Sequence, residues 1–267
     1  MNILFLTPQL PYPPRQGASM RNYFVLKGVA AEHTVSLLSY REPHQPQDEA
    51  TLAPLLALVK QLVVVEIDPR PWARRLAQFA GSLRPDLSFR LASAQFDQQL
   101  RHLLQQNQFD IVQIEGLELA RTIEIVRQVS PHSRIVFDNH NVETALQERT
   151  MRTDWQHPRR WLAALYSTVQ VWKLRRYEIW ASTEADAVTV VSETDRELLQ
   201  VMAPAVAAKI EAIPNCIDVA PYLSLAEQAD TAVVYDLVFV GKMDYRPNVD
   251  GVLWFASEIW PLIRAAR

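Results

Sequence analysis

Short apolar runs alternate with helical segments from Ile3 to Ile213, and this alternation limits the chain to few folds. Each run is rich in Ile, Leu, Val or Phe, as is typical of strands buried on both faces of a parallel sheet. Strands joined by right-handed helical crossovers form a doubly wound sheet. We therefore predict an α/β fold with a mostly parallel, seven-stranded, Rossmann-like domain. Its strands are Ile3–Leu6, Thr34–Tyr40, Gln61–Ile67, Asp110–Glu115, Ile135–Phe137, Ala187–Val191 and Ile210–Ile213.

The segments between these runs carry apolar residues at helical spacing, so they predict helices that cover the sheet. These helices are Ala18–Ala31, about Asp48–Val59, Leu117–Val129, one entering near Val142, Pro158–Thr183 and Glu193–Met202. Ser192 and Asp195 form a near capping box for the last of them. Two helical pieces punctuated by prolines, Trp72–Ser82 and Ser88–Gln106, are expected to form an outer layer or a lid.

The pattern changes after the seventh run. We expect a first domain over residues 1–217, a polar linker over 218–233 and an incomplete start of a second domain over 234–267. The last part holds one predicted strand, Tyr235–Val240, and one predicted helix, Val249–Arg264. One strand and one helix cannot bury a core of their own. We therefore expect them to be the first βα unit of a second Rossmann-like domain that this chain does not complete.

Composition excludes several classes of function. The chain has 267 residues, 49% of them hydrophobic, and a net charge of −3, so it has no overall attraction for nucleic acid. A single cysteine, Cys216, excludes an internal disulfide and fits a reducing cytoplasm. No apolar segment approaches the ~20 residues that span a bilayer. We expect a cytoplasmic protein, with the inner face of the membrane as an alternative location.

Polar side chains follow two of the predicted strands. The segment RIVFDNHNVE places Asn139 and His140 directly after one strand, and Glu115 ends another. Ligands bind beyond the carboxyl ends of strands in such sheets, and an imidazole exchanges protons near neutral pH. We expect Glu115, Asn139 and His140 to contact a ligand, with His140 in a catalytic role. Alternatively, His140 only hydrogen-bonds to nearby backbone, Asn139 is a turn residue, and the Glu115 carboxylate is stabilised by a helix dipole. No histidine or cysteine pair has metal-ligand spacing, so no metal site is expected.

Glycine and cations mark a second group of candidates. Gly17, at the entry to the first helix, could let the backbone approach a diphosphate at the helix N-terminus. Arg15 in the same loop could meet the acceptor or a phosphate. Lys242 and Arg246 lie in the loop GKMDYRPN and could stabilise a diphosphate leaving group. The alternatives are an ordinary turn glycine and solvated surface cations.

The predicted helix Pro158–Thr183 mixes tryptophans with cations. Its apolar stripe includes Trp161, Leu165 and Trp172. The tryptophans in and beside it are Trp155, Trp161, Trp172 and Trp180, and the cations are Arg159, Arg160, Lys173, Arg175 and Arg176. We expect the tryptophans to pack in the core and the cations to be solvated. The alternative is a peripheral surface for a membrane that holds an anionic, lipid-linked acceptor.

Four segments of the chain stand in a characteristic order: TPQLPYPPRQGASMRNYFVLKGVA, FDNHNVE, ADAVTVVSETDRELL with IPNCIDV, and DLVFVGKMDYRPNVDGVLWFASEIWPLI. In this order they resemble the retaining glycosyltransferases of family 4, and the last resembles sugar transferases of bacterial exopolysaccharide loci. The resemblance implies a GT-B fold of two facing Rossmann-like domains. It also implies transfer of a sugar from a nucleotide-diphospho-sugar to a saccharide or lipid-linked hydroxyl acceptor, with retention and with no cofactor or required metal. His140 matches the histidine that contacts the donor sugar, and Lys242 and Arg246 match paired basic residues that stabilise the diphosphate leaving group. With sugar transfer implied, we expect Arg15, Glu115 and Asn139 on the acceptor side.

The chain departs from the family pattern at three places. Gly17 is followed by Ala18 where two adjacent glycines are usual, and Cys216 replaces a turn glycine. The family also has two glutamates, eight residues apart, that bind the donor sugar and ribose, and we expect their positions to lie beyond Arg267. A binding module that recognises an acceptor or a partner protein but transfers nothing is therefore the alternative function. A sugar-nucleotide epimerase would need catalytic carboxylates, for which Glu115 and Asp138 are the candidates.

Overall fold

The computed structural model describes the whole chain except residues 157–159, 221–222, 224–236, 242, 244–245 and 267. The chain divides into two compact units, residues 1–218 and 219–267, and each is described by itself.

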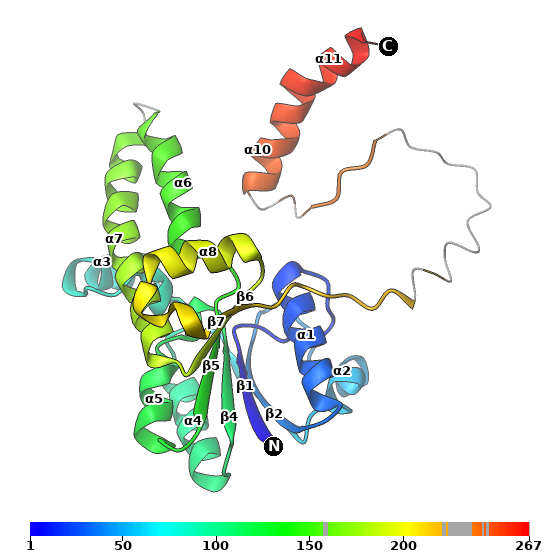
Figure 1. Cartoon of the computed structure of the whole chain (residues 1–267), viewed down its shortest axis with the longest axis vertical. Coiled ribbons are helices and arrows are strands. Elements are labelled where there is room, and N and C mark those ends of the chain that lie inside the picture. Colours follow the sequence, from blue (N-terminus) through cyan, green and yellow to red (C-terminus); the bar gives the residue numbers. More distant parts are fainter. Residues whose placement is uncertain (157–159, 221–222, 224–236, 242, 244–245, 267) are drawn as a thin grey trace. The chain divides into compact units, whose positions relative to one another are not determined.

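The first unit is built on one parallel sheet of seven strands, as the apolar runs predict (Figure 1). Every neighbouring pair of strands is parallel. The strands are β1 (Asn2–Thr7), β2 (Thr34–Arg41), β3 (Gln61–Glu66), β4 (Ile111–Glu115), β5 (Arg134–Asp138), β6 (Ala187–Val190) and β7 (Ile210–Ala212).

The strand order is β3-β2-β1-β4-β5-β6-β7, so the direction of winding reverses between β1 and β4. These two strands pair in register from Ile3 opposite Ile111 to Leu6 opposite Ile114. Their carboxyl ends therefore lie side by side, with Glu115 at the end of β4. In doubly wound sheets the crevice at this reversal is where ligands bind.

Alternate residues of β1 enter two hydrophobic clusters, one on each face of the sheet. Ile3 and Phe5 pack with residues of α1 and α2, whereas Leu4 and Leu6 pack with residues of α4, α5 and α7. The helices are α1 (Gly17–Ala30), α2 (Glu49–Leu56), α3 (Trp72–Gly81), α4 (Ala94–Gln106), α5 (Thr122–Val129), α6 (Glu143–Trp155), α7 (Trp161–Glu184) and α8 (Glu193–Met202). Ser192 caps α8 by accepting the Asp195 N–H at 3.1 Å, as the sequence predicts. Short 3-10 turns lie at η1 (Asp86–Phe89), η2 (Leu117–Leu119) and η4 (Pro204–Lys209).

The two proline-punctuated pieces differ in their packing. α3 buries none of its residues and forms an outer element, as expected. The other piece is split into η1 and α4, and α4 buries Phe96, Leu100 and Leu103 in the main core. Its assignment to an outer layer or lid was therefore wrong, because its apolar stripe is long enough to cover the sheet.

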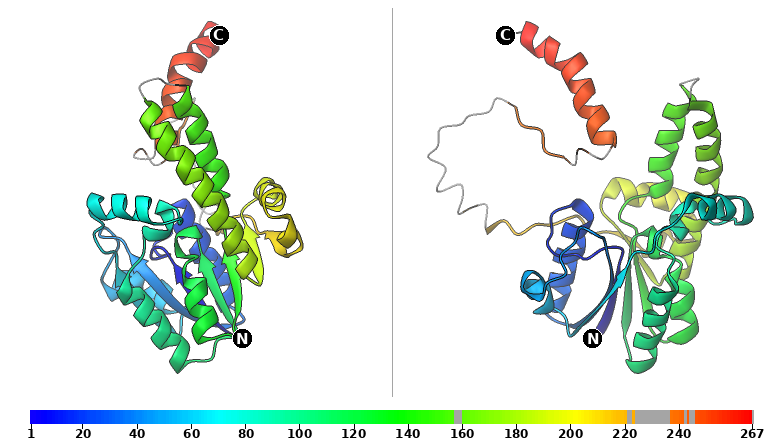
Figure 2. Two further views of the ribbon diagram at one scale, coloured as in Figure 1. Left: turned by 90° about the vertical axis from the view of Figure 1, so that its left-hand side faces the viewer. Right: turned by 180° about the vertical axis from the view of Figure 1, so that it is seen from behind.

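α6 and α7 form a helical hairpin that projects beyond the carboxyl edge of the sheet (Figures 1 and 2). The expectation that its tryptophans pack in the core was wrong for three of them. Trp155, Trp161 and Trp172 are 47%, 58% and 48% exposed. Trp180, nearer the sheet, is partly buried.

Specific polar contacts explain why α7 turns its other face inward. The Gln170 side chain accepts the Asp86 N–H at 2.9 Å, and the Lys173 ammonium donates to the Phe79 carbonyl at 2.6 Å. Glu178 is fully buried under the start of α6. Together with Leu174 and Tyr177 in the core, these bonds fix the rotation of α7. Lys173 is 5% exposed, so the expectation that it is a solvated cation was wrong.

The described part of the second unit is helical from α10 (Arg246–Trp254) through a π-helical turn (Phe255–Ile259) to α11 (Trp260–Ala265), which confirms the predicted helix. The strand expected at Tyr235–Val240 is not formed over 237–240, where Leu237 and Val240 are exposed; 235–236 lie outside the described residues. A strand forms only with a partner strand, and the described part of this unit offers none. Among the helices that the structure describes, none has the length and apolar character to cross a bilayer.

Candidate active site

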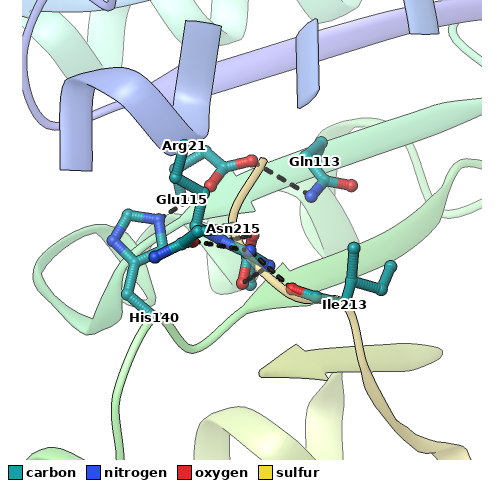
Figure 3. Close-up of polar contacts among 7 residues, drawn as sticks. Arg21, Gln113, Glu115, His140, Ile213 and Asn215 are labelled. Atoms are coloured by element: carbon teal, nitrogen blue, oxygen red, sulfur yellow. Dashed lines mark hydrogen bonds and ion pairs between the residues drawn. The ribbon is translucent and has the colours of Figure 1, made fainter. Parts of the chain in front are cut away.

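The candidate site lies at the carboxyl ends of β4 and β5, next to the reversal of the sheet (Figure 3). Glu115 and Asp138 are the last residues of these strands, and the first half of α1 supplies Arg21 and Asn22. α1 is held at its start by Ser19, whose hydroxyl accepts the Gln16 N–H at 3.1 Å. Gly116, at a φ of +84°, then turns the chain and donates its N–H to the Asp138 carbonyl at 2.9 Å.

Arg21 and Asp138 form a buried, bidentate ion pair. The guanidinium donates from Nε to Oδ2 at 2.8 Å and from Nη2 to Oδ1 at 3.0 Å, and the two side chains are 2% and 1% exposed. Nη1 donates to the Ile213 carbonyl at 2.6 Å and to Asn215 Oδ1 at 3.1 Å. Arg21 therefore joins the end of β5 to the segment that leaves β7 (Figure 3).

Glu115 and His140 form a second pair at the same edge. His140 Nε2 lies 2.9 Å from Glu115 Oε2, and Gln113 donates to Glu115 Oε1 at 3.1 Å. In the orientation that satisfies its amide, Asn22 donates to Glu115 Oε2 at 3.1 Å and to the Ala18 carbonyl at 3.2 Å. The carboxylate is fully buried, whereas the imidazole is 16% exposed. The sequence placed both residues at this edge, and the structure brings them into direct contact.

For each residue of this pair, burial shifts the pKa in one direction and the hydrogen bond to its partner shifts it in the other. Burial and the negative charge of Asp138 raise the pKa of Glu115, while the hydrogen bond from His140 lowers it; the net direction is upward. Burial lowers the pKa of His140, but the hydrogen bond and charge of Glu115 outweigh it and raise that pKa. The imidazole therefore takes up a proton more readily beside this carboxylate than it would alone. No described residue hydrogen-bonds to His140 Nδ1, so that nitrogen is the atom that can reach a ligand.

Asn139 is turned into the protein. Its side chain is 1% exposed and donates to Glu178 Oε1 at 2.6 Å. Glu178 also accepts the N–H groups of Glu143 and Thr144, at 3.0 and 3.1 Å, and so caps α6 from α7. Burial raises the pKa of Glu178, and hydrogen bonds to Thr144 and Asn139 oppose that shift. This burial argues against the acceptor contact that the sequence predicted for Asn139.

Glu143, the first residue of α6, is a half-buried carboxyl near the pair. Burial and the charges of Glu118 and Glu178 raise its pKa to about 7, against the opposing charge of His140. The sequence left open whether Glu143 caps α6 or meets a ligand. The capping is done by Glu178, so the Glu143 carboxyl is free to exchange a proton near neutral pH.

The remaining predicted residues fall in two places. Gly17 begins α1, where Gln16 and Ser19 form a capping box, and a Cβ built at Gly17 would meet no atom within 4 Å. Arg15, in the preceding loop, is exposed. Lys242 lies outside the described residues, and Arg246 begins α10 with a side chain that also lies outside them.

One cluster has the ligand atoms for a cation. Among the described residues, atoms of Glu115, Asp138 and His140 lie within 4.8 Å of one another. Both oxygens of Asp138 already accept hydrogen bonds from Arg21, and His140 Nε2 is bonded to Glu115. A metal would therefore meet a buried positive charge and would have to break these bonds. The residues suit an ion-pair network better than a metal, and the expectation of a site without metal stays a prediction.

Sequence reasoning missed Arg21, Asn22, Gln113 and Glu178. Arg21 and Asn22 lie beside Leu26 on the buried part of α1, and Glu178 lies on the buried part of α7. A charged side chain at a position that should face the sheet was the available signal. Its partners could not be found that way, because Arg21 and Asp138 are 117 residues apart.

Comparison with known proteins identifies the family. The sequence pattern that defines Glycosyltransferase Family 4 matches residues 16–221. No curated protein matches the chain.

Solved structures give a fold likeness at low identity. Medicago truncatula UGT71G1, complexed with UDP-glucose, superposes with a TM-score of 0.50 at 13% identity, over 82% of this chain and 52% of that one. Phytolacca americana UGT2, complexed with UDP-2fluoro-glucose and pterostilbene, gives 0.49 at 12% identity, over 85% of this chain and 57% of that one. The Candida albicans trehalose-6-phosphate phosphatase N-terminal domain gives 0.47 at 14% identity, over 86% and 51%.

The chain thus spans about half the length of these proteins. The parallel sheet, its helices and the likeness to UGT71G1 are those of an α/β, Rossmann-like GT-B fold. With the family pattern matched over most of its length, this chain belongs to glycosyltransferase family 4.

Proposed function

We propose that the protein transfers a sugar from a nucleotide-diphospho-sugar to a hydroxyl acceptor, with retention at the anomeric carbon, in polysaccharide or glycoconjugate synthesis. Family membership supports sugar transfer as the reaction class. The observation that carries the proposal is the Glu115–His140 pair, because the partly exposed imidazole lies next to the reversal of the sheet and no described residue bonds its Nδ1. The proposed location is the cytoplasm, at the inner face of the membrane, and no nucleic acid is involved.

In the proposed reaction, the bond between the anomeric carbon and the diphosphate oxygen breaks. The acceptor oxygen bonds to that carbon on the same face, and the acceptor proton passes to the departing diphosphate. The protein positions the reactants and stabilises charge, which are the largest contributions available without an enzymic nucleophile. The N-terminus of α1 at Gly17 is suited to an anionic group such as the diphosphate. The assignment of Lys242 and Arg246 to phosphate charge rests on the sequence alone. No metal or cofactor is required in this scheme.

We assign His140 to a hydroxyl of the donor sugar through Nδ1. Glu115 is too buried for substrate, so we assign it to holding the imidazole and its proton. Asn139 is assigned to ordering the loop after β5 through Glu178, and Arg15 to the acceptor. This revises the acceptor contact that the sequence favoured for Glu115 and Asn139.

The test is a transfer assay with a panel of nucleotide-diphospho-sugars and simple saccharide acceptors. It is run on this chain and on a longer version that includes any residues encoded after Arg267. Product with the same anomeric configuration as the donor, read by NMR, supports the proposal. Inverted product contradicts retention, and epimerised donor without transfer favours the epimerase.

A binding module is the second candidate, because the chain spans about half the length of the solved structures it resembles. Saccharide binding without turnover in both versions would favour it. Turnover by either version excludes it.

A further inference from the structure

α7 carries a row of apolar and cationic side chains on the outside of the first unit. Trp161, Leu165, Trp172 and Arg176 follow one another at spacings of four and seven that keep them on one side of a helix, and all are exposed. The inward side of α7 packs Leu174 and Tyr177 in the core, beside several small and polar residues. The outer side therefore carries large apolar side chains where a solvent-facing side is normally polar.

Two neighbours extend this row. Trp155, at the end of α6, donates its indole N–H to the Thr168 hydroxyl at 3.3 Å and so lies beside it. The Arg176 guanidinium lies 4.9 Å above the Trp172 ring, and Arg175 is exposed next to it. We define the α7 outer face as Trp155, Trp161, Leu165, Trp172, Arg175 and Arg176.

The charge of this face contrasts with that of the whole chain. The chain has a net charge of −3, whereas the charged residues of the α7 outer face are arginines. Of the nearby acids, Asp154 and Glu178 are buried, and the partly exposed Glu148 lies 4.0 Å from the cation of Arg152. An anionic surface would therefore be attracted to this face and not to the protein at large.

We propose that the α7 outer face docks on an anionic lipid bilayer. Tryptophan rings prefer the headgroup level, and arginines beside them meet lipid phosphates, as in helices that lie in the membrane interface. From Trp161 to Arg176 the row runs about 22 Å along the helix, from a rise of 1.5 Å per residue. That length lets several anchors touch the same surface at once.

Docking also has a consequence for the candidate site. The hairpin projects beyond the same edge of the sheet that carries Glu115 and His140 (Figure 2). A bilayer on the α7 outer face lies near that edge. If the proposed transfer is correct, the acceptor class is then a hydroxyl on a lipid-linked saccharide; this clause alone rests on the proposed function.

The test is co-sedimentation of the protein with vesicles, which needs no catalytic activity. Vesicles of equal parts phosphatidylglycerol and phosphatidylcholine are compared with phosphatidylcholine alone, at about 0.1 M and about 1 M salt, where the Debye length falls from about 10 to about 3 Å. We expect binding to the anionic vesicles only, weakened at high salt. Equal binding to both, or no binding to the anionic vesicles, overturns the proposal.

Variants locate the surface. Trp161→Ala with Trp172→Ala, and separately Arg176→Glu, should each weaken binding at least about tenfold. The matched controls are Val201→Ala on α8 and Arg101→Glu on α4, which are exposed and should bind as the wild type does. Circular dichroism checks that each variant is folded.

Two results would contradict the assignment of membrane docking to the α7 outer face. Equal losses in Arg101→Glu and Arg176→Glu would show attraction without a specific face. A dimer in solution that the tryptophan variant abolishes would assign the α7 outer face to a second copy of the chain. Either result overturns the proposal, and neither depends on whether sugar transfer is detected.

Discussion

Replacing Arg21 by methionine tests the buried network that holds the candidate site. The change keeps most of the aliphatic volume but leaves the Asp138 carboxylate, 1% exposed, without its cation. Removing one partner of a buried ion pair costs about 3–5 kcal/mol, because the other charge stays desolvated. The lost donors to Ile213 and Asn215 add little, since Ile213 is 45% exposed and water can replace them. We expect the free energy of unfolding to fall by about 3–5 kcal/mol, a large share of the ~5–15 kcal/mol of a typical domain.

Urea unfolding followed by far-UV circular dichroism measures this change. Arg127→Met is the matched control, because its pair with Asp186 spans a similar 2.9 Å but is solvent-exposed. Exposed pairs contribute about 0–1 kcal/mol. Adding Asp138→Asn to Arg21→Met removes the unpaired charge and should recover part of the loss. A cost for Arg21→Met equal to that of Arg127→Met, or a double variant less stable than the single one, would refute the reasoning.

Three further predictions concern the same edge of the sheet. His140→Ala in the active protein should lower turnover at least about tenfold with unchanged circular dichroism, because a transition-state contact is lost; unchanged rates in a folded variant would remove His140 from the site. The pKa of Glu143 is raised to about 7 in the folded protein, from 4.5 when unfolded. Its contribution to stability is therefore largest below pH 4.5, where this carboxyl is protonated in both states, and falls by up to about 3 kcal/mol as the pH rises to 7. Glu143→Gln should therefore gain stability relative to wild type over this range, and parallel pH curves would contradict it. Gly116→Ala should cost about 1–2 kcal/mol in thermal unfolding, because φ is +84° and its Cβ would lie 2.9 Å from Glu118 Oε2; Gly28→Ala, with open space, should be neutral or stabilising.

The sheet was predictable because its signal is local. Each strand is a short apolar run between helical segments, and parallel pairing follows from the helical crossovers. The expected strand over Tyr235–Val240 has the same local signal, but over 237–240 it is not a strand. Local pattern alone cannot supply a partner strand.

The site was predictable only in part. Placing Glu115 and His140 at one edge needs only the rule that parallel strands end together. Arg21 pairs with Asp138 and reaches Ile213, and such distant contacts leave no pattern in the sequence. α7 shows a related limit, because periodicity groups Trp161 and Trp172 on one side without saying which side meets the sheet. Buried polar contacts through Gln170 and Lys173 decide that instead.

NMR of the protein labelled with ¹⁵N-histidine tests the central claim most directly, namely that a sugar nucleotide binds at the edge formed by β4 and β5. The chain has six histidines, and the spectrum of His140→Gln assigns the signal of His140. Adding a nucleotide-diphospho-sugar should shift the Nδ1 signal of His140 and leave those of exposed histidines such as His102 unchanged. Binding that shifts His102 and leaves His140 unmoved would contradict the account.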